Sequence, residues 1–239
     1  TPAHLEFLAA QMPPASANGR TRAFVIGGEQ LRAETLSFWR KHAPNTRLVN
    51  EYGPTETVVG CCIHAVTDET PATGVVPIGR PIANTRLYVL GGAMDPVPVG
   101  VAGELYIGAD GLARGYWNRP ELTAARFVPD PFAGDAHARL YRTGDRVRYL
   151  PDGNLEFLGR LDTQVKLRGF RIELGEIEAV LAQQPQVREA VVLLREDTPG
   201  DPRLVAYVVT QGEALVAADL RAALKQLLPD YMIPAAFLL

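Results

Sequence analysis

Residues 47–56 read RLVNEYGPTE, a short apolar strand that runs straight into a turn. The Gly-Pro pair marks the turn, because proline holds φ near one value and glycine adopts backbone angles that other residues avoid. We expect the strand to end at Asn50 and the turn to bring Thr55 and Glu56 into one small volume. A hydroxyl beside a carboxylate is a suitable oxygen pair for Mg²⁺. An ordinary turn with solvated polar ends would explain the same residues.

The segment before this turn alternates between helix and strand patterns. Strand, helix and strand in that order predict a parallel sheet with a right-handed crossover, whose ligands lie at the carboxyl ends of the strands. Leu31, Phe38 and Trp39 have the spacing of one helix face. The predicted elements are a helix LEFLAAQM (5–12), a strand AFVIGG (23–28), a helix EQLRAETLSFWRKHA (29–43) and the strand RLVN (47–50).

Residues 61–161 lose helical periodicity, and short strands alternate with Gly/Pro turns. The PDGN at 151–154 is a hairpin turn, because proline presets one angle and Asp-Gly supports the reversal. This pattern predicts an antiparallel sheet or barrel.

Residues 162–239 predict a small α+β unit: a hairpin turning at Gly169, helices over 174–184 and 217–228, and two further strands. We therefore expect two domains, 1–161 and 162–239. In the last helix Leu220, Leu224, Leu227 and Leu228 are predicted to share one face.

Composition excludes several function classes. The 24 basic and 27 acidic residues are interspersed and give a net charge of −3, so there is no electrostatic case for nucleic acid. No apolar run approaches the roughly 18 residues of a membrane helix. Cys61 and Cys62 are adjacent and without metal-ligand spacing, which favours small core residues in a reduced, cytoplasmic setting.

Two polar motifs remain open when read in isolation. RTGD at 142–145 could offer its carboxylate to a diol, or it could be a solvated turn. The charged stretch 159–178 suits either a hinge or a solvated linker.

Taken in order, however, the motifs closely resemble the adenylation domains of nonribosomal peptide synthetases. The resemblance spans about residues 24–234. It implies an α/β fold of two domains. Residues 1–161 would be the C-terminal portion of the large adenylate-forming domain, with a partial parallel sheet and an antiparallel barrel-like part. Residues 162–239 would be a small α+β lid. The motifs are NEYGPTE (50–56), GELYIGADGLARGYWNRPELTAARF (103–127), YRTGD (141–145), GRLDTQVKLRGFRIELGEIE (159–178) and LPDYMIP (228–234).

The resemblance implies an ATP- and Mg²⁺-dependent amino-acid-activating ligase that forms an aminoacyl-AMP and transfers the amino acid to the phosphopantetheine thiol of a carrier domain. Adjacent synthetase domains would be further partners. By this resemblance Tyr52 would contact the adenine with Asn50 nearby, Gly53 would form the nucleotide turn, Thr55 would contact the α-phosphate and Glu56 would bind Mg²⁺. Asp145 would contact the ribose, and Arg160 would contact the ribose and the phosphates. Asp162 would be the hinge, and Lys166 and Gly169 would lie in the segment that faces the active site in the thioester-forming state.

The family's pocket positions fall on Val25, Gly27, Glu51, Val59 and Gly60. The glycines leave room, the valines are apolar, and a confined carboxylate requires a donor or a cation. The set resembles pockets for a polar amide side chain, asparagine first and a basic residue second.

The resemblance is incomplete at both ends. The family's phosphate loop and the aspartate that binds the substrate amine should precede residue 1, and its final catalytic lysine should follow Leu239. We therefore expect a fragment, with a truncated lid, that is inactive alone. The alternatives are an acyl- or aryl-CoA ligase of the same superfamily, or a non-catalytic nucleotide- or carrier-binding module.

Overall fold

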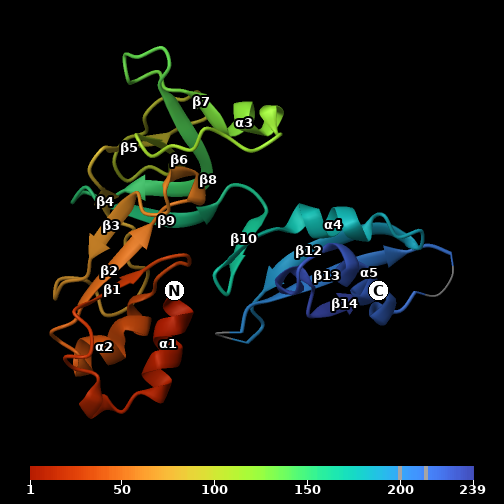
Figure 1. The fold of residues 1–239 in the computed structure, drawn as a ribbon, viewed down its shortest axis with the longest axis horizontal. Coiled ribbons are helices and arrows are strands. Elements are labelled where there is room, and N and C mark those ends of the chain that lie inside the picture. Colours follow the sequence, from red (N-terminus) through yellow and green to blue (C-terminus); the bar gives the residue numbers. More distant parts are fainter. Residues whose placement is uncertain (199–200, 213–214) are drawn as a thin grey trace. The chain divides into compact units, whose positions relative to one another are not determined.

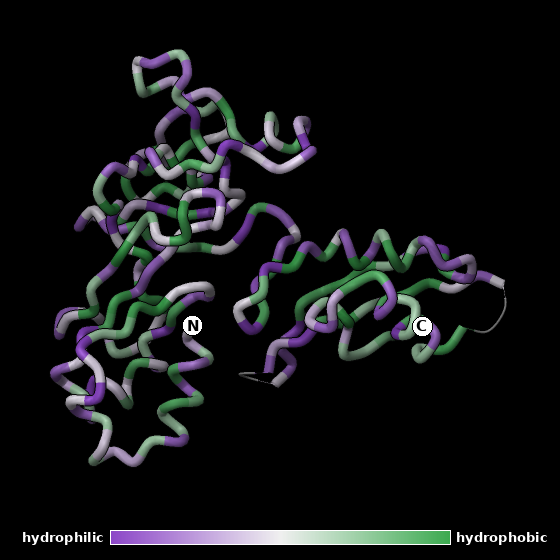
Figure 2. Tube along the Cα trace, viewed as in Figure 1, coloured by the Kyte–Doolittle hydropathy of each residue, from purple (hydrophilic) through white to green (hydrophobic). Residues whose placement is uncertain are grey.

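The computed structural model describes residues 1–198, 201–212 and 215–239. The chain forms two compact units, unit 1 (Thr1–Leu161) and unit 2 (Asp162–Leu239), whose elements are coloured along the chain in Figure 1. Hydrophobic and hydrophilic segments alternate in both units (Figure 2). Among the described residues, no helix is both long and apolar enough to cross a membrane.

Unit 1 begins with a four-stranded sheet of order β1-β2-β3-β4. The first two strands are parallel, with Val25 opposite Val49, and the remaining pairs are antiparallel. The buried Leu36 and Trp39 belong to the core beside this sheet. The elements are α1 (Pro2–Gln11), β1 (Ala23–Ile26), α2 (Ser37–His42), β2 (Arg47–Tyr52), β3 (Cys62–Ala65) and β4 (Arg80–Pro81), with 3₁₀ turns at Pro14–Ser16, Ala33–Leu36 and Thr55–Thr57.

Two predicted boundaries in this region are wrong. β2 continues to Tyr52 instead of ending at Asn50, because Tyr52 pairs with Cys62 of β3. The predicted helix over 29–43 is reduced to a 3₁₀ turn and the short α2. The first part of the predicted helix pairs with segment 74–75 through its backbone. Ala33 donates its N–H to the Gly74 carbonyl at 2.9 Å, and Arg32 forms an antiparallel β-bridge with Val75.

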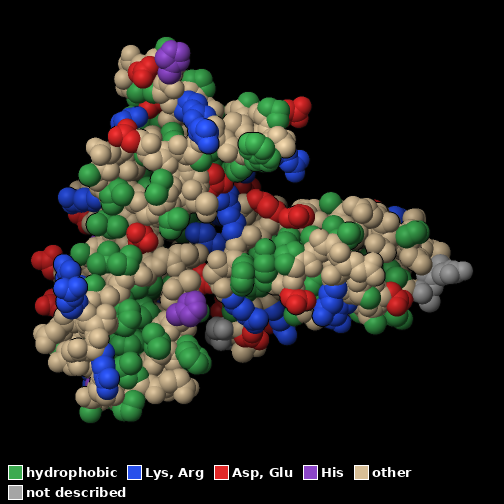
Figure 3. Space-filling model, in the orientation of Figure 1, with side chains coloured by type: hydrophobic (Ala, Val, Ile, Leu, Met, Phe, Trp, Pro, Cys, Tyr) green, Lys and Arg blue, Asp and Glu red, His purple; other side chains and the backbone are tan. Residues whose placement is uncertain are grey.

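The rest of unit 1 is a five-stranded antiparallel sheet of order β5-β6-β8-β7, in which β9 also pairs with β8. The PDGN hairpin is confirmed: Leu150 donates to the Asn154 carbonyl at 2.7 Å, and Gly153 has φ +83°. In the view of Figure 3, the basic and acidic side chains of unit 1 are interspersed. The elements are β5 (Thr85–Leu90), β6 (Gly103–Ala109), α3 (Pro120–Arg126), β7 (Phe127–Pro129), β8 (Arg139–Tyr149) and β9 (Leu155–Arg160).

Unit 2 is the predicted α+β arrangement. A hairpin of β10 and β11 precedes a three-stranded sheet of order β12-β13-β14, and one hydrophobic core joins hairpin, helices and sheet. Together with unit 1, this confirms the predicted α/β class. The elements are β10 (Gln164–Leu167), β11 (Phe170–Glu173), α4 (Leu174–Leu181), β12 (Val187–Arg195), β13 (Arg203–Thr210), α5 (Ala217–Leu227), a 3₁₀ turn (Asp230–Met232) and β14 (Ala236–Leu238).

One member of the predicted leucine face is wrong. Leu220, Leu224 and Leu228 are buried, but Leu227 is 61% exposed. The helix ends at Leu227 and the chain becomes extended at Leu228 (φ −123°, ψ 148°), so that Leu228 instead of its neighbour reaches the core.

The core of unit 2 draws only on side chains between Val165 and Phe237, so we expect residues 162–239 to fold alone. In that segment Leu224→Ala should lower the free energy of unfolding by about 2–4 kcal/mol, because it leaves a cavity. The exposed Leu227→Ala is the matched control and should cost less than about 0.5 kcal/mol. Urea unfolding followed by circular dichroism measures both, and equal losses would contradict the assigned helix face.

Candidate nucleotide-binding site

The loop after β2 is closed by a backbone hydrogen bond between its ends, and its first residue, Gly53, has no room for a side chain. Cys61 donates its backbone N–H to the Tyr52 carbonyl at 3.0 Å. A Cβ added at Gly53 would lie 2.0 Å from the Val59 carbonyl oxygen, so only glycine fits. Val58 and Val59 adopt left-handed φ values of 66° and 68°, which is a strained conformation for β-branched residues. Such strain is frequent at functional sites.

Within this loop Thr55 is exposed and Glu56 is buried in a polar setting. The Tyr116 hydroxyl donates to Glu56 Oε1 at 2.6 Å, and Ala113 donates its N–H to the Glu56 carbonyl at 2.9 Å. Tyr116 is held in turn by its backbone N–H, which donates to Thr123 Oγ1 at 2.9 Å. The segment 113–123 therefore holds both the backbone and the carboxylate of Glu56.

Tyr116 is a site residue that sequence reasoning missed. Its position inside the long motif 103–127 was a signal, but a motif does not tell which of its side chains reaches a residue about sixty positions earlier. Only the fold brings the two together.

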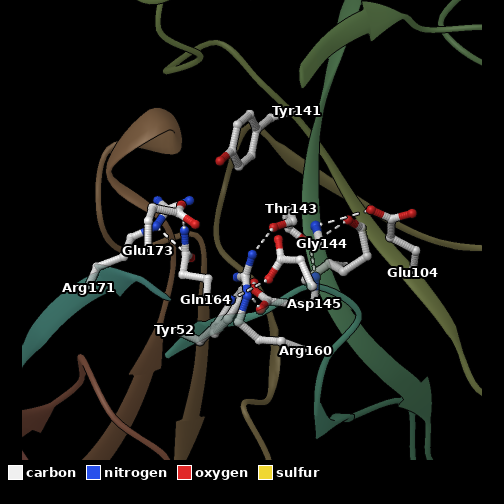
Figure 4. Close-up of polar contacts among 12 residues, drawn as sticks. Tyr52, Glu104, Tyr141, Thr143, Gly144, Asp145, Arg160, Gln164, Arg171 and Glu173 are labelled. Atoms are coloured by element: carbon white, nitrogen blue, oxygen red, sulfur yellow. Dashed lines mark hydrogen bonds and ion pairs between the residues drawn. The ribbon is translucent and has the colours of Figure 1, made fainter. Parts of the chain in front are cut away.

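Asp145 lies on β8 and is buried, which makes the solvated-turn interpretation of RTGD wrong. Arg160 on the neighbouring β9 donates to Asp145 Oδ1 at 2.7 Å and to the Thr143 carbonyl at 3.1 Å. The side chains of Arg160 and Asp145 are only 11% and 6% exposed. The Tyr52 hydroxyl donates to Asp145 Oδ2, and Figure 4 shows the three side chains converging.

Tyr52 keeps its proton over the ordinary pH range. Burial, together with the neighbouring Asp145 carboxylate, raises the pKa of Tyr52 well above its usual range. The phenol is 7% exposed and belongs to a hydrophobic cluster, so its hydroxyl acts as a hydrogen-bond donor to Asp145. This contact joins the end of β2, where the Thr55–Glu56 turn starts, to the YRTGD strand.

Asn50 has a similar internal contact. Its side-chain nitrogen donates to the carbonyls of Val76 and Pro77 at 3.3 and 2.8 Å, and the residue is buried. This amide ties the end of β2 to segment 76–77. Adenine contact by Asn50 or Tyr52 stays a prediction.

Three of the five predicted pocket positions are adjacent. A Cβ added at Gly27 would lie 2.9 Å from the Glu51 carbonyl oxygen, and one added at Gly60 would lie 2.3 Å from Glu51 Oε1. The two glycines therefore leave the space in which Glu51 lies. Val25 and Val59 are 62% and 60% exposed, and their role as pocket residues stays a prediction.

The site residues predicted in unit 2 lie on the β10–β11 hairpin or just before it. Arg168 and Gly169 both have positive φ, 52° and 82°, the signature of a tight two-residue hairpin turn. Lys166 is exposed on β10. Asp162 accepts the N–H of Gln164 at 3.2 Å just before the hairpin.

The two cysteines are core residues, as predicted. Both are free and buried, and burial raises the pKa of the Cys61 thiol to about 12. Burial also raises the pKa of Cys62. Neither is a nucleophile at ordinary pH.

Comparison with known proteins shows the family to which the chain is related. Residues 1–117 match the family model described as AMP-binding enzyme, and residues 176–239 match the model described as AMP-binding enzyme C-terminal domain. Tyrocidine synthase 3 of Brevibacillus parabrevis is 47% identical over 239 residues, which is 100% of this chain and 4% of that protein. The dimodular nonribosomal peptide synthase of Bacillus subtilis is 51% identical over 213 residues, which is 89% of this chain and 9% of that protein.

Two solved structures are similar over nearly the whole chain. PA1221, an NRPS protein containing adenylation and PCP domains, has TM-score 0.82 and 34% identity over 98% of this chain and 46% of its own. The Vibrio cholerae adenylation domain AlmE in complex with glycyl-adenosine-5'-phosphate has TM-score 0.85 and 27% identity over 100% of this chain and 45% of its own. This chain therefore spans about half of these structures and a small part of the two synthases. It belongs to the AMP-binding enzymes, among the adenylation domains of nonribosomal peptide synthetases.

Breaking the buried ion pair between Asp145 and Arg160 should lower the free energy of unfolding more than breaking an exposed ion pair does. Asp145→Ala leaves a mostly buried guanidinium without its carboxylate, and we expect a loss of about 3 kcal/mol in the free energy of unfolding. The control is Glu156→Ala, because Glu156 accepts from Arg148 at 2.5 Å across the same two strands in a more exposed place. For Glu156→Ala the loss in the free energy of unfolding should stay below about 1 kcal/mol. Denaturant unfolding of the two variants compares them, and similar losses would show that burial does not distinguish the pairs.

Proposed function

We propose that this chain is part of an enzyme that selects an amino acid, activates it with ATP and transfers it to the phosphopantetheine thiol of a peptidyl carrier domain. The observation that carries the proposal is the Asp145 carboxylate, which is buried in unit 1 and held by Arg160 and by Tyr52, the last residue of the strand before the Thr55–Glu56 turn. In this proposal unit 1 is the C-terminal portion of the large nucleotide-binding domain. Unit 2 is the lid.

The proposed reaction has two steps. A carboxylate oxygen of the amino acid attacks the α-phosphorus of ATP, and the bond from this phosphorus to the leaving pyrophosphate breaks. The thiolate of the carrier then attacks the acyl carbon and AMP leaves. The first step requires mainly positioning and neutralisation of charge, which polar and cationic side chains provide.

The residues of unit 1 have separate tasks in this scheme. Asp145 accepts hydrogen bonds from the ribose hydroxyls, since a carboxylate has about four lone-pair sites and can hold partners besides Tyr52 and Arg160. Arg160 contacts the ribose and phosphate region, and the exposed Thr55 hydroxyl contacts the α-phosphate. The backbone at Gly53 allows the turn that brings Thr55 to the nucleotide.

The donor set fits Mg²⁺. This ion is commonly held by one or two carboxylates together with substrate phosphates, and Glu56 next to Thr55 supplies such a carboxylate. When bound, the ion neutralises phosphate charge. Tyr116 holds the Glu56 carboxylate in place for it through the 2.6 Å hydrogen bond.

Unit 2 has a role in the second step. We propose Asp162 as the hinge, and Lys166 with Gly169 as the segment that faces the active site during thioester formation, because one site then serves both reactions in turn. PA1221 contains a PCP domain beside its adenylation domain, which supports a carrier and adjacent synthetase domains as partners. The peptide synthase relatives do not favour a CoA ligase. The proposed location is the cytoplasm.

For the substrate we propose a polar side chain, asparagine first. The support is Glu51, whose carboxylate lies in the space left by Gly60 and can accept hydrogen bonds from an amide or a cation.

The ribose role is tested in the enzyme that carries this chain by ATP–pyrophosphate exchange. Asp145→Asn keeps the shape but removes the charge, and it should lower kcat/KM for ATP at least about tenfold, because hydrogen bonds to a charged acceptor are the strong ones. The control Glu156→Gln should leave kcat/KM for ATP within about twofold of the wild-type value. If Asp145→Asn exchanges pyrophosphate like the wild type, the proposed site is wrong.

The pocket role of Glu51 gives a separate expectation. Glu51→Ala should reduce the preference for the native amino acid over alanine about tenfold, because a buried donor on the substrate loses its acceptor. The measurement is the ratio of kcat/KM values across a panel of amino acids in the exchange assay. An unchanged ratio would remove Glu51 from the pocket, and a uniform fall for all substrates would indicate damage to the fold.

A further inference from the structure

The strand that carries Asp145 is irregular at this position. In the β6–β8 pairing, Glu104 lies opposite Arg146 and Tyr106 lies opposite Arg142. The three residues 143–145 of β8 therefore oppose the single residue Leu105, which is a β-bulge. Bulges are frequent next to active sites, where they redirect a side chain.

The centre of the bulge, Gly144, has φ +75°, in the left-handed region that favours glycine. Its backbone groups have defined partners on two sides. Its N–H donates to Glu104 Oε1 at 3.1 Å, and its carbonyl accepts the N–H of Leu161 at 2.8 Å. The conformation that precedes Asp145 is thus held by contacts from β6 and from the end of unit 1.

Glu104 reaches both the centre and the start of the bulge. In addition to the Gly144 N–H, its carboxylate accepts from Arg142 Nε at 3.0 and 3.1 Å and from the Tyr106 hydroxyl at 3.4 Å. The Glu104 side chain is 11% exposed, whereas its partner Arg142 is half exposed. Figure 4 shows Glu104 bonded to the bulge from the side away from Arg160.

Thr143 completes the support from within the strand. Its hydroxyl donates to the Leu105 carbonyl at 2.7 Å and accepts the backbone N–H of Asp145 at 2.9 Å. The main chain at Asp145 is thereby linked to β6, and the direction of its carboxylate depends on the bulge.

We propose that Glu104 is a positioning residue for nucleotide recognition: through Gly144 it holds the bulge that directs the Asp145 carboxylate toward the ribose hydroxyls. The inference rests on the proposed ribose role of Asp145. Glu104 bonds to Gly144, Arg142 and Tyr106, and its effect reaches the nucleotide only by way of Asp145.

The test compares ATP with 2′-deoxy-ATP and 3′-deoxy-ATP in pyrophosphate exchange, using the enzyme that carries this chain. The wild type should prefer ATP over at least one deoxy analogue by about tenfold or more, since a hydrogen bond to a charged acceptor is lost. Glu104→Ala should reduce this preference about fivefold or more by raising KM for ATP with a smaller change in kcat. Glu104→Gln retains an acceptor for the Gly144 N–H, so its preference for ATP should lie between that of the wild type and that of Glu104→Ala.

Two further variants separate positioning from general damage. Gly144→Ala disfavours the left-handed backbone and should reduce the preference like Glu104→Ala. Glu156→Gln removes a carboxylate that bonds to an arginine on the same strand, away from the bulge, and should keep the preference. Binding of ATP and of the deoxy analogue by calorimetry gives the same comparison without turnover.

The outcomes distinguish the two proposals. If Asp145→Asn loses the preference but Glu104→Ala keeps it with both analogues, the positioning role of Glu104 is wrong and the proposed function stands. If the wild type does not discriminate, or Asp145→Asn discriminates as well as the wild type, the ribose role itself is wrong. Lower activity of Glu104→Ala with an unchanged preference would show a purely structural effect and would also overturn the inference.

Discussion

The buried pair of Asp145 and Arg160 is the contact on which the candidate site depends. It joins β8 to β9, and Tyr52 adds a hydrogen bond from the end of β2. Three segments that are separate along the chain therefore meet at one carboxylate. A charge in such a place is stable only when partners surround it, and these partners also determine its direction.

Local backbone constraints around this contact are just as demanding. Gly53 allows the loop after β2 to close, because any side chain there would collide with the Val59 carbonyl. Gly144 allows the bulge before Asp145 through its positive φ. Both glycines precede by one or two positions a residue with a proposed nucleotide contact. The irregular backbone is thus concentrated where polar side chains must leave the regular sheet.

Much of the fold could be predicted because its signals are local. The hairpins at PDGN and at Gly169 follow from turn chemistry that involves a few neighbouring residues. Most of the leucine face of α5 and the burial of Cys61 and Cys62 follow from apolar patterning. The largest failure has a non-local cause. The helix over 29–43 was shortened by backbone hydrogen bonds to segment 74–76, and no local pattern contains that partner.

For the site, the sequence by itself determined which residues are present and the family in which they have this order. The tertiary structure decided which of them meet: that Tyr52 donates to Asp145, that Tyr116 orients Glu56, and that Glu104 holds the bulge before Asp145. The physical reason is that these contacts join positions about 40 to 90 residues apart. Turn propensity and periodicity act over a few residues, whereas such pairs exist only after the sheets have formed.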